Sequence, residues 1–120
     1  MARIAPVVAQ RVVQATRALA HHAKVRAAYV FGSQVEGTSN AQSDIDLAVF
    51  VEGAEQWDIF RRAAITALVQ GEVGDDVELH YFPAQALAQP APASFVAHVL
   101  HYGVQISDTD STGLVGVETG

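Results

Sequence analysis

Cysteine is absent from the chain's 120 residues, which excludes disulfide bonds and thiolate metal sites. No apolar run approaches the roughly 20 residues that a membrane-spanning helix needs, and no secretory signal opens the chain. Internal repeats and low-complexity tracts are also lacking. The length suits one hydrophobic core. We therefore expect a single cytoplasmic domain that has no membrane partner.

Positive charge is scarce, because seven Lys and Arg residues stand against thirteen Asp and Glu residues, for a net charge of -6. The basic residues concentrate before Ala27, and only Arg61 and Arg62 follow. An enzyme that acts on nucleic acid is expected to carry a basic track for the phosphate backbone. The distribution therefore argues against direct nucleic-acid binding. The early basic residues form either a solvated helix face or a docking face for an acidic partner.

Two aspartates, Asp44 and Asp46, open a run that alternates with the period of a β-strand as far as Val51. Side chains in a strand alternate between its faces, so both carboxylates are expected to project from one face, opposite a wholly apolar face. Like charges this close disfavour each other's ionised form unless a cation lies between them. Magnesium prefers oxygen ligands and often takes one or two carboxylates together with substrate phosphates. An isolated Asp-x-Asp is a weak signal, since it also occurs as two solvated side chains.

Gly32 and Ser33 follow an extended apolar run over residues 27–31. Glycine lets backbone N–H groups approach a phosphate closely, and serine adds a hydroxyl donor. Alone, a Gly-Ser pair after a strand is an ordinary turn. Combined with the two aspartates further along the chain, it predicts a site for a nucleoside triphosphate held through magnesium.

Residues 29–50, which read YVFGSQVEGTSNAQSDIDLAVF, resemble the signature of the minimal nucleotidyltransferases, a family of the DNA polymerase β-like superfamily. The resemblance covers about residues 7 to 107 and is specific in the Gly-Ser to Asp-x-Asp block. It implies an α+β fold in which helices flank a small mixed β-sheet. We expect residues 1–107 to form this nucleotidyltransferase domain, and 108–120, which are polar and contain glycine, to form a flexible tail.

The same resemblance implies a third carboxylate on a neighbouring strand. Glu78 matches it by position in the run over residues 75–82, although the family more commonly has aspartate there. Asp76 shares that face of the run and is the alternative. His80 also shares the face and is a candidate for contact with the nucleotide or with a proton in transfer.

The implied reaction joins a nucleoside monophosphate, AMP from ATP in the leading interpretation, to a hydroxyl acceptor. In this interpretation Asp44 and Asp46 bind Mg²⁺, and Ser33 and the amide after Gly32 hold the outer phosphates. Glu78 then helps to bind a second Mg²⁺ or takes the acceptor's proton. A two-metal site can stabilise both the entering and the leaving oxygen.

The acceptor and the partner also follow from the resemblance. Single-domain members of the family commonly work with a separate helical HEPN protein, and the spacer between Gly-Ser and Asp-x-Asp resembles that of antitoxins. Those antitoxins transfer AMP to a tyrosine of a HEPN ribonuclease toxin, in some cases within a hetero-oligomer. Two alternatives remain open. One is a small-molecule nucleotidyltransferase that modifies, for instance, an aminoglycoside. The other is a binding module that neutralises its partner by occlusion.

The remaining pattern predicts the scaffold. Helices are expected over residues 6–23, 54–70 and 93–102, followed by a short strand over 104–107. In the second helix the spacing places Trp57, Phe60, Ala64 and Leu68 on one side. His98 and His101 are three residues apart but are too few for a structural zinc site.

Overall fold

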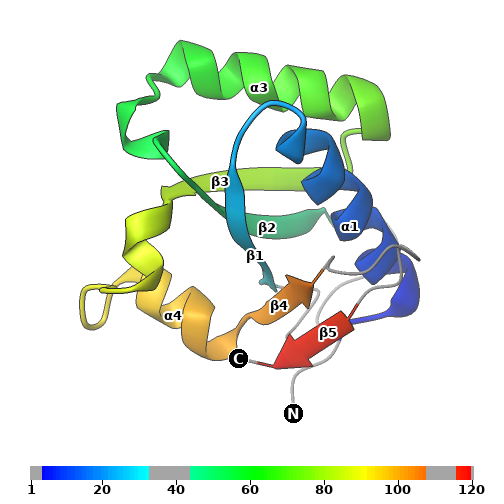
Figure 1. Ribbon diagram of the computed structural model, residues 1–120. Helices are drawn as coiled ribbons and strands as arrows, with labels where there is room; N and C mark the ends of the chain where they lie inside the picture. Colours follow the sequence, from blue (N-terminus) through cyan, green and yellow to red (C-terminus); the bar gives the residue numbers. More distant parts are fainter. Residues whose placement is uncertain (1–3, 33–43, 108–115, 120) are drawn as a thin grey trace.

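The computed structural model describes residues 4–32, 44–107 and 116–119 (Figure 1). Three α-helices and five strands alternate there with two short 3₁₀ segments. In chain order these are α1 (Pro6–Ala20), β1 (Val25–Phe31), β2 (Ile45–Val51), η1 (Ala54–Gln56), α3 (Ile59–Val73), β3 (Val77–Pro83), η2 (Ala84–Leu87), α4 (Phe95–Tyr102), β4 (Val104–Ser107) and β5 (Gly116–Thr119). None of these helices has the length and apolarity required to span a bilayer.

The strands form one mixed sheet in the order β3-β2-β1-β4-β5. Strands β2 and β3 are parallel, and the other neighbours are antiparallel. Parallel neighbours need a long crossover connection, which α3 supplies. Helices α1 and α3 pack on one face of the sheet, whereas α4 and η2 pack on the other (Figure 1). This is the α+β fold that the sequence predicts.

Strand β2 lies between β1 and β3 and is buried on both faces along most of its length. Leu47, Val49 and Val51 point into the core beneath α1 and α3, as the alternation predicts. Ala48 and Phe50 point to the opposite face, where α4 covers them. Burial of each large apolar side chain contributes about 1.5–3 kcal/mol. The Asp46 side chain lies on the same face as Ala48 and Phe50 but is 28% exposed. The part of this face that α4 covers therefore ends at Asp46.

The predicted second helix differs from the observed one at both ends. The chain forms η1, leaves helical geometry at Trp57, and begins α3 at Ile59. The helix starts there because the Asp58 carboxylate accepts a hydrogen bond from the N–H of Arg61, which satisfies an unpaired donor of the first turn. Ile65 and Val69 are the buried residues of α3. The side that carries Phe60 and Leu68 faces outward, since these side chains are 80% and 53% exposed.

The other predicted elements lie near their expected positions. Helix α1 ends at Ala20, earlier than the sequence predicts, and α4 begins at Phe95 after a cap from the Ser94 hydroxyl. Strand β4 occupies the predicted residues. Within the segment for which we predict a flexible tail, Gly116–Thr119 pair with β4 as strand β5. The rest of that tail lies outside the described residues.

An ion pair joins α1 to the start of β3. The Arg11 guanidinium donates from Nε and Nη2 to the two carboxylate oxygens of Asp76, at 2.8 and 2.7 Å. Arg11 also donates to the carbonyl of Val73 at the end of α3. The hydrogen bonds from Arg11 hold the pKa of Asp76 below its usual range. The Arg11 guanidinium therefore links α1 to the end of α3 and to the start of β3.

We expect the substitution Asp76→Asn to lower the free energy of unfolding by about 1 kcal/mol at pH 7, because a partly exposed bidentate pair is lost. The pKa of Asp76 is lower in the folded state, so its contribution is present above the unfolded pKa and disappears as the pH falls through the folded pKa. Urea unfolding at pH 7 and at about pH 3 should show the difference between variant and wild type shrinking. Asp75→Asn is the control, and a variant as stable as wild type at pH 7 would contradict the assignment.

Candidate functional site

Three potential metal ligands converge on the face of the sheet that α4 partly covers. Asp46 on β2 is the register partner of Glu78 on β3, and His80 follows two residues later on the same face. The ligating atoms of the three side chains all lie within 4.8 Å of one another. His80 Nε2 lies 3.2 Å from Asp46 Oδ1 and 4.0 Å from Glu78 Oε2. Parallel pairing thus brings together residues more than thirty positions apart.

The cluster is open to solvent on one side and supported on the other. The side chains of Asp46 and His80 are 28% and 32% exposed, and that of Glu78 is 59% exposed. The ring of Phe31 packs edge-on against the ring of His80, with centroids 5.0 Å apart. Phe31 in turn contacts Phe95 of α4. An aromatic wall therefore holds the imidazole in place while the two carboxylates remain accessible to a ligand.

Gly32 lies directly against the carboxylate of Asp46. Its φ of +81° is in the left-handed region, which favours glycine. A Cβ atom at this position would lie 2.7 Å from Asp46 Oδ2. The sequence predicts that Gly32 permits close approach of a phosphate. The structure adds that Gly32 leaves space for the carboxylate itself.

The remaining predicted site residues have different positions. Ser33 lies outside the described residues. Asp44 is exposed immediately before β2 and is not part of the three-residue cluster. Of the two alternatives for the third carboxylate, Glu78 joins the cluster. Asp76 is instead held by Arg11, because the start of β3 is drawn to α1.

His80 lies on the face that the sequence predicts, and the structure adds it to the group of potential metal ligands. Its spacing of two residues from Glu78 was the available signal, since such residues share a strand face. Two carboxylates and an imidazole suit a divalent cation: the oxygens suit Mg²⁺, and the imidazole extends the set toward Mn²⁺ or Zn²⁺. The donor set therefore fits a divalent metal.

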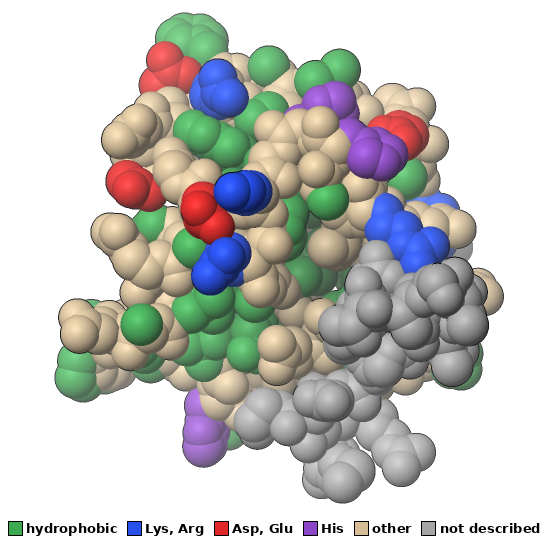
Figure 2. Space-filling model, viewed as in Figure 1, with side chains coloured by type: hydrophobic (Ala, Val, Ile, Leu, Met, Phe, Trp, Pro, Cys, Tyr) green, Lys and Arg blue, Asp and Glu red, His purple; other side chains and the backbone are tan. Residues whose placement is uncertain are grey.

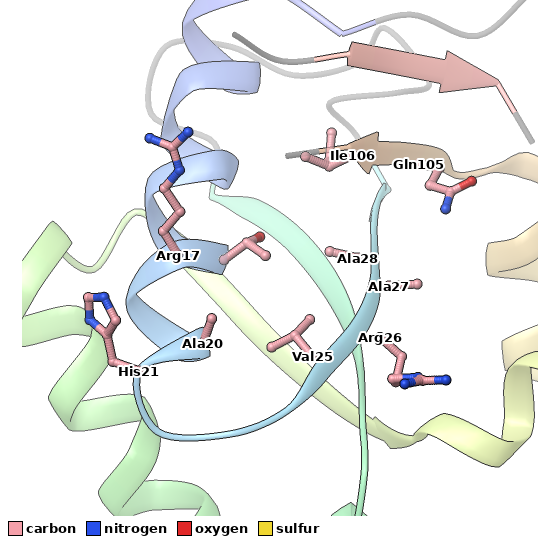
Figure 3. Close-up of a pocket in the computed structure, with 10 residues that line it drawn as sticks. Arg17, Ala20, His21, Val25, Arg26, Ala27, Ala28, Gln105 and Ile106 are labelled. Atoms are coloured by element: carbon pink, nitrogen blue, oxygen red, sulfur yellow. The ribbon is translucent and has the colours of Figure 1, made fainter. Parts of the chain in front are cut away.

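A hollow of about 540 Å³ lies on the opposite face of the sheet, between the end of α1 and strands β1 and β4. Figure 3 shows Arg17 and Arg26 at opposite sides of it. Arg26 pairs with Glu52 at 3.0 Å, and Arg11 of α1 pairs with Asp76 at 2.7 Å. These pairs place two early basic side chains beside acidic residues of the same chain, which favours the interpretation of a solvated face over a docking face.

Comparisons with known proteins agree with this geometry. Residues 14–112 match the family described as "Polymerase beta, Nucleotidyltransferase", and the chain belongs to that family. A crystal structure of a candidate nucleotidyltransferase from Sulfolobus solfataricus is similar, with a TM-score of 0.54 and 18% sequence identity. The similarity covers 69% of this chain and 73% of that protein, and it shows a shared fold. No curated protein matches the chain.

Membership in this family indicates which kind of metal ion the cluster could bind. Polymerase β-like nucleotidyltransferases use divalent metals, and the cluster of Asp46, Glu78 and His80 is a possible site for one. A divalent ion would also offset the repulsion between the two carboxylates. The sheet face that carries the cluster is therefore the candidate active site.

Gly32→Ala is expected to weaken binding of Mn²⁺ at least tenfold, because the added methyl group displaces the Asp46 carboxylate. Gly53→Ala is the matched control: Gly53 has nearly the same φ, +82°, but no atom lies within 4 Å of an added Cβ. Both variants should lose about 1 kcal/mol of stability from the left-handed backbone. Isothermal titration of Mn²⁺ separates the two effects. Equal affinities in the two variants would show that Gly32 has no special relation to the site.

Proposed function

We propose that this chain catalyses metal-dependent transfer of a nucleoside monophosphate, AMP from ATP, to a hydroxyl acceptor. The observation that carries the proposal is the convergence of Asp46, Glu78 and His80 beside Gly32, in a chain of the nucleotidyltransferase family. Because the carboxylates are accessible while the imidazole is supported from behind, the arrangement suits a ligand that approaches from solvent.

In the proposed reaction the acceptor oxygen forms a bond to the α-phosphorus of the triphosphate. The bond from the α-phosphorus to the bridging oxygen breaks, and pyrophosphate leaves. The acceptor's proton passes to a basic group, for which Glu78 and His80 are the available side chains. When bound, divalent metal neutralises charge on the phosphates and on both oxygens.

The chain's own residues have distinct parts in this proposal. Asp46 and Glu78 hold the metal, and His80 either completes the ligand set or accepts the proton. Gly32 provides close backbone approach to the phosphates. We assign Ser33 as a hydroxyl donor to the outer phosphates and Asp44 as a further carboxylate of a two-metal site, on the basis of their place in the sequence signature.

The substitutions Asp46→Asn and Glu78→Gln are each expected to lower the rate of nucleotidyl transfer at least 100-fold, because neutral amides bind a divalent cation poorly. Release of pyrophosphate from ATP in the presence of acceptor measures the rate. Glu55→Gln, at an exposed residue of η1, serves as the control and should keep the wild-type rate. Full activity in either cluster variant would refute the metal assignment, and Asp44→Asn tests the third carboxylate in the same assay.

For the acceptor we propose a tyrosine of a HEPN-type ribonuclease toxin, so that the chain acts as its antitoxin. Support comes from the spacer between the Gly-Ser and Asp-x-Asp elements, which resembles that of such antitoxins. The described residues also form one sheet with its helices, and no separate acceptor-binding domain occurs among them.

Incubation with labelled ATP, Mg²⁺ and the protein encoded by the neighbouring gene is expected to place AMP on a tyrosine of that protein, as read by mass spectrometry. The reaction should fail with the Asp46→Asn variant and persist with Glu55→Gln. If wild type labels no residue of the neighbour but still releases pyrophosphate with other hydroxyl acceptors, the acceptor is wrong while the transfer chemistry stands.

One observation favours a second candidate. Glu78 stands where the family more commonly has aspartate, and its side chain is 59% exposed. A longer and largely exposed ligand suits a weakened site, in which case the chain would neutralise its partner by occlusion alone. Titration with Mg-ATP distinguishes the two functions, since an occluding module with a degenerate site should bind the nucleotide poorly.

A further inference from the structure

Strand β3 forms one edge of the sheet. In the described part of the chain its strand neighbour is β2, on one side. The N–H of Ile45 in β2 donates to the carbonyl of Asp76, just before β3. The even-numbered residues of β3 therefore direct their N–H and C=O groups toward β2. Val77, Leu79 and Tyr81 therefore direct their N–H and C=O groups away from the sheet. Such an edge is a template for pairing with another strand.

A groove of about 610 Å³ runs beside this edge, between α3 and β3. Ile59, Ala63 and Ala67 of α3 form one wall, and Leu79 and Tyr81 belong to the other. Among the α3 residues that line the groove, Arg62 alone is charged, and its guanidinium donates to the carbonyl of Ala54. The groove is therefore mixed, with Arg62, Thr66 and Gln70 beside apolar residues on its α3 wall, and the small side chains of Ala63 and Ala67 allow another helix to approach closely.

Helix α3 carries large apolar side chains on its outer side as well as on its inner side, although Arg61 and Glu72 are also exposed. Ile65 and Val69 are buried against the sheet, yet Ile59 and Phe60 on the outward side are 75% and 80% exposed. Apolar side chains reach the surface along α3 at the top of Figure 2. A helix that is apolar on both sides is normally covered on both sides. The strand edge and the helix face adjoin each other, so one partner can cover both.

We propose that this partner is a second copy of the chain. Two β3 strands would pair antiparallel about a two-fold axis and join the two five-stranded sheets into one. The same operation places the groove side of α3 against its counterpart. The surface is self-complementary, because it offers a strand edge that needs a strand and an apolar helix that needs an apolar helix.

The polar side chains of β3 favour one register for this pairing, in which a carboxylate can accept a hydrogen bond from an imidazole N–H. With the axis at Leu79, Glu78 lies opposite the partner's His80, and the reciprocal pair forms by symmetry. An axis at Glu78 or at His80 would instead oppose two carboxylates or two imidazoles. The Leu79 register also pairs Val77 with the partner's Tyr81. The outward N–H and C=O groups of both strands then meet as antiparallel hydrogen-bonded pairs.

This register connects the interface to the candidate active site. Glu78 and His80 lie on the sheet face that carries Asp46. Directly opposed side chains in an antiparallel pair have Cβ atoms about 5 Å apart, so the partner's Glu78 would lie beside the acidic cluster. Each cluster would then include a carboxylate from the second copy. The pairing itself stands independently of the proposed transfer reaction.

The mass in solution tests the proposal, measured by light scattering after size exclusion over a range of concentrations. Wild type should have twice the 12.7 kDa mass of one chain and dissociate on dilution. Ala63→Glu places a carboxylate on the groove wall and should give a folded monomer. Ala20→Glu, at an exposed residue of α1 that lines the separate hollow beside β1 and β4, is the matched control and should remain a dimer.

Amide hydrogen exchange tests the strand pairing separately. The N–H groups of Val77, Leu79 and Tyr81 should be protected in wild type and should exchange rapidly in Ala63→Glu, with circular dichroism confirming that the variant is folded. A wild-type monomer at all concentrations overturns the proposal, whether or not it forms a one-to-one complex with a helical partner through α3. A dimer in which these three amides exchange freely also overturns it, because its interface then lies elsewhere.

Discussion

Parallel pairing of β2 with β3 is the constraint on which the site depends. The two carboxylates of the cluster come from different strands, and only the register that sets Asp46 opposite Glu78 brings them together with His80. That register is fixed by burial: Leu47, Val49 and Val51 on β2 and Val77 on β3 are almost wholly buried beneath α1 and α3. A slip by one residue would expose these side chains and reverse the faces of the site residues. Core packing thus positions the ligands.

The opposite face of the sheet has two different environments along one strand. Toward the end of β2, Phe50 lies in an aromatic cluster with Tyr29 and Phe82. At its start, Asp46 is partly exposed beside Gly32. Helix α4 and its Phe95 mark the border between the two. The candidate site therefore lies where α4 no longer covers the sheet. Phe31 supports it from behind, and its carboxylates are accessible to solvent.

Much of this arrangement could be predicted from local sequence. The alternation over residues 44–51 predicts β2, and the family resemblance leads to Glu78. The parts that local patterns could not supply depend on distant contacts. Asp76 is held by Arg11, 65 residues away in the sequence. The residues next to Asp76 therefore give no signal that its carboxylate lies outside the cluster. In α3, apolar residues occur on both sides, and the spacing that joins Phe60 to Leu68 is as regular as the one that joins Ile65 to Val69. Only the packed sheet decides which side is buried.

Helix α3 is the sole covalent link between the two strands of the site, since the chain passes from β2 through η1 and α3 to β3. Its inner side rests on the sheet, and its last turn is tied by the Val73 carbonyl to Arg11. Contact with the outer side of this helix is therefore contact with the element that joins the strands of Asp46 and Glu78, the two carboxylates of the candidate metal site.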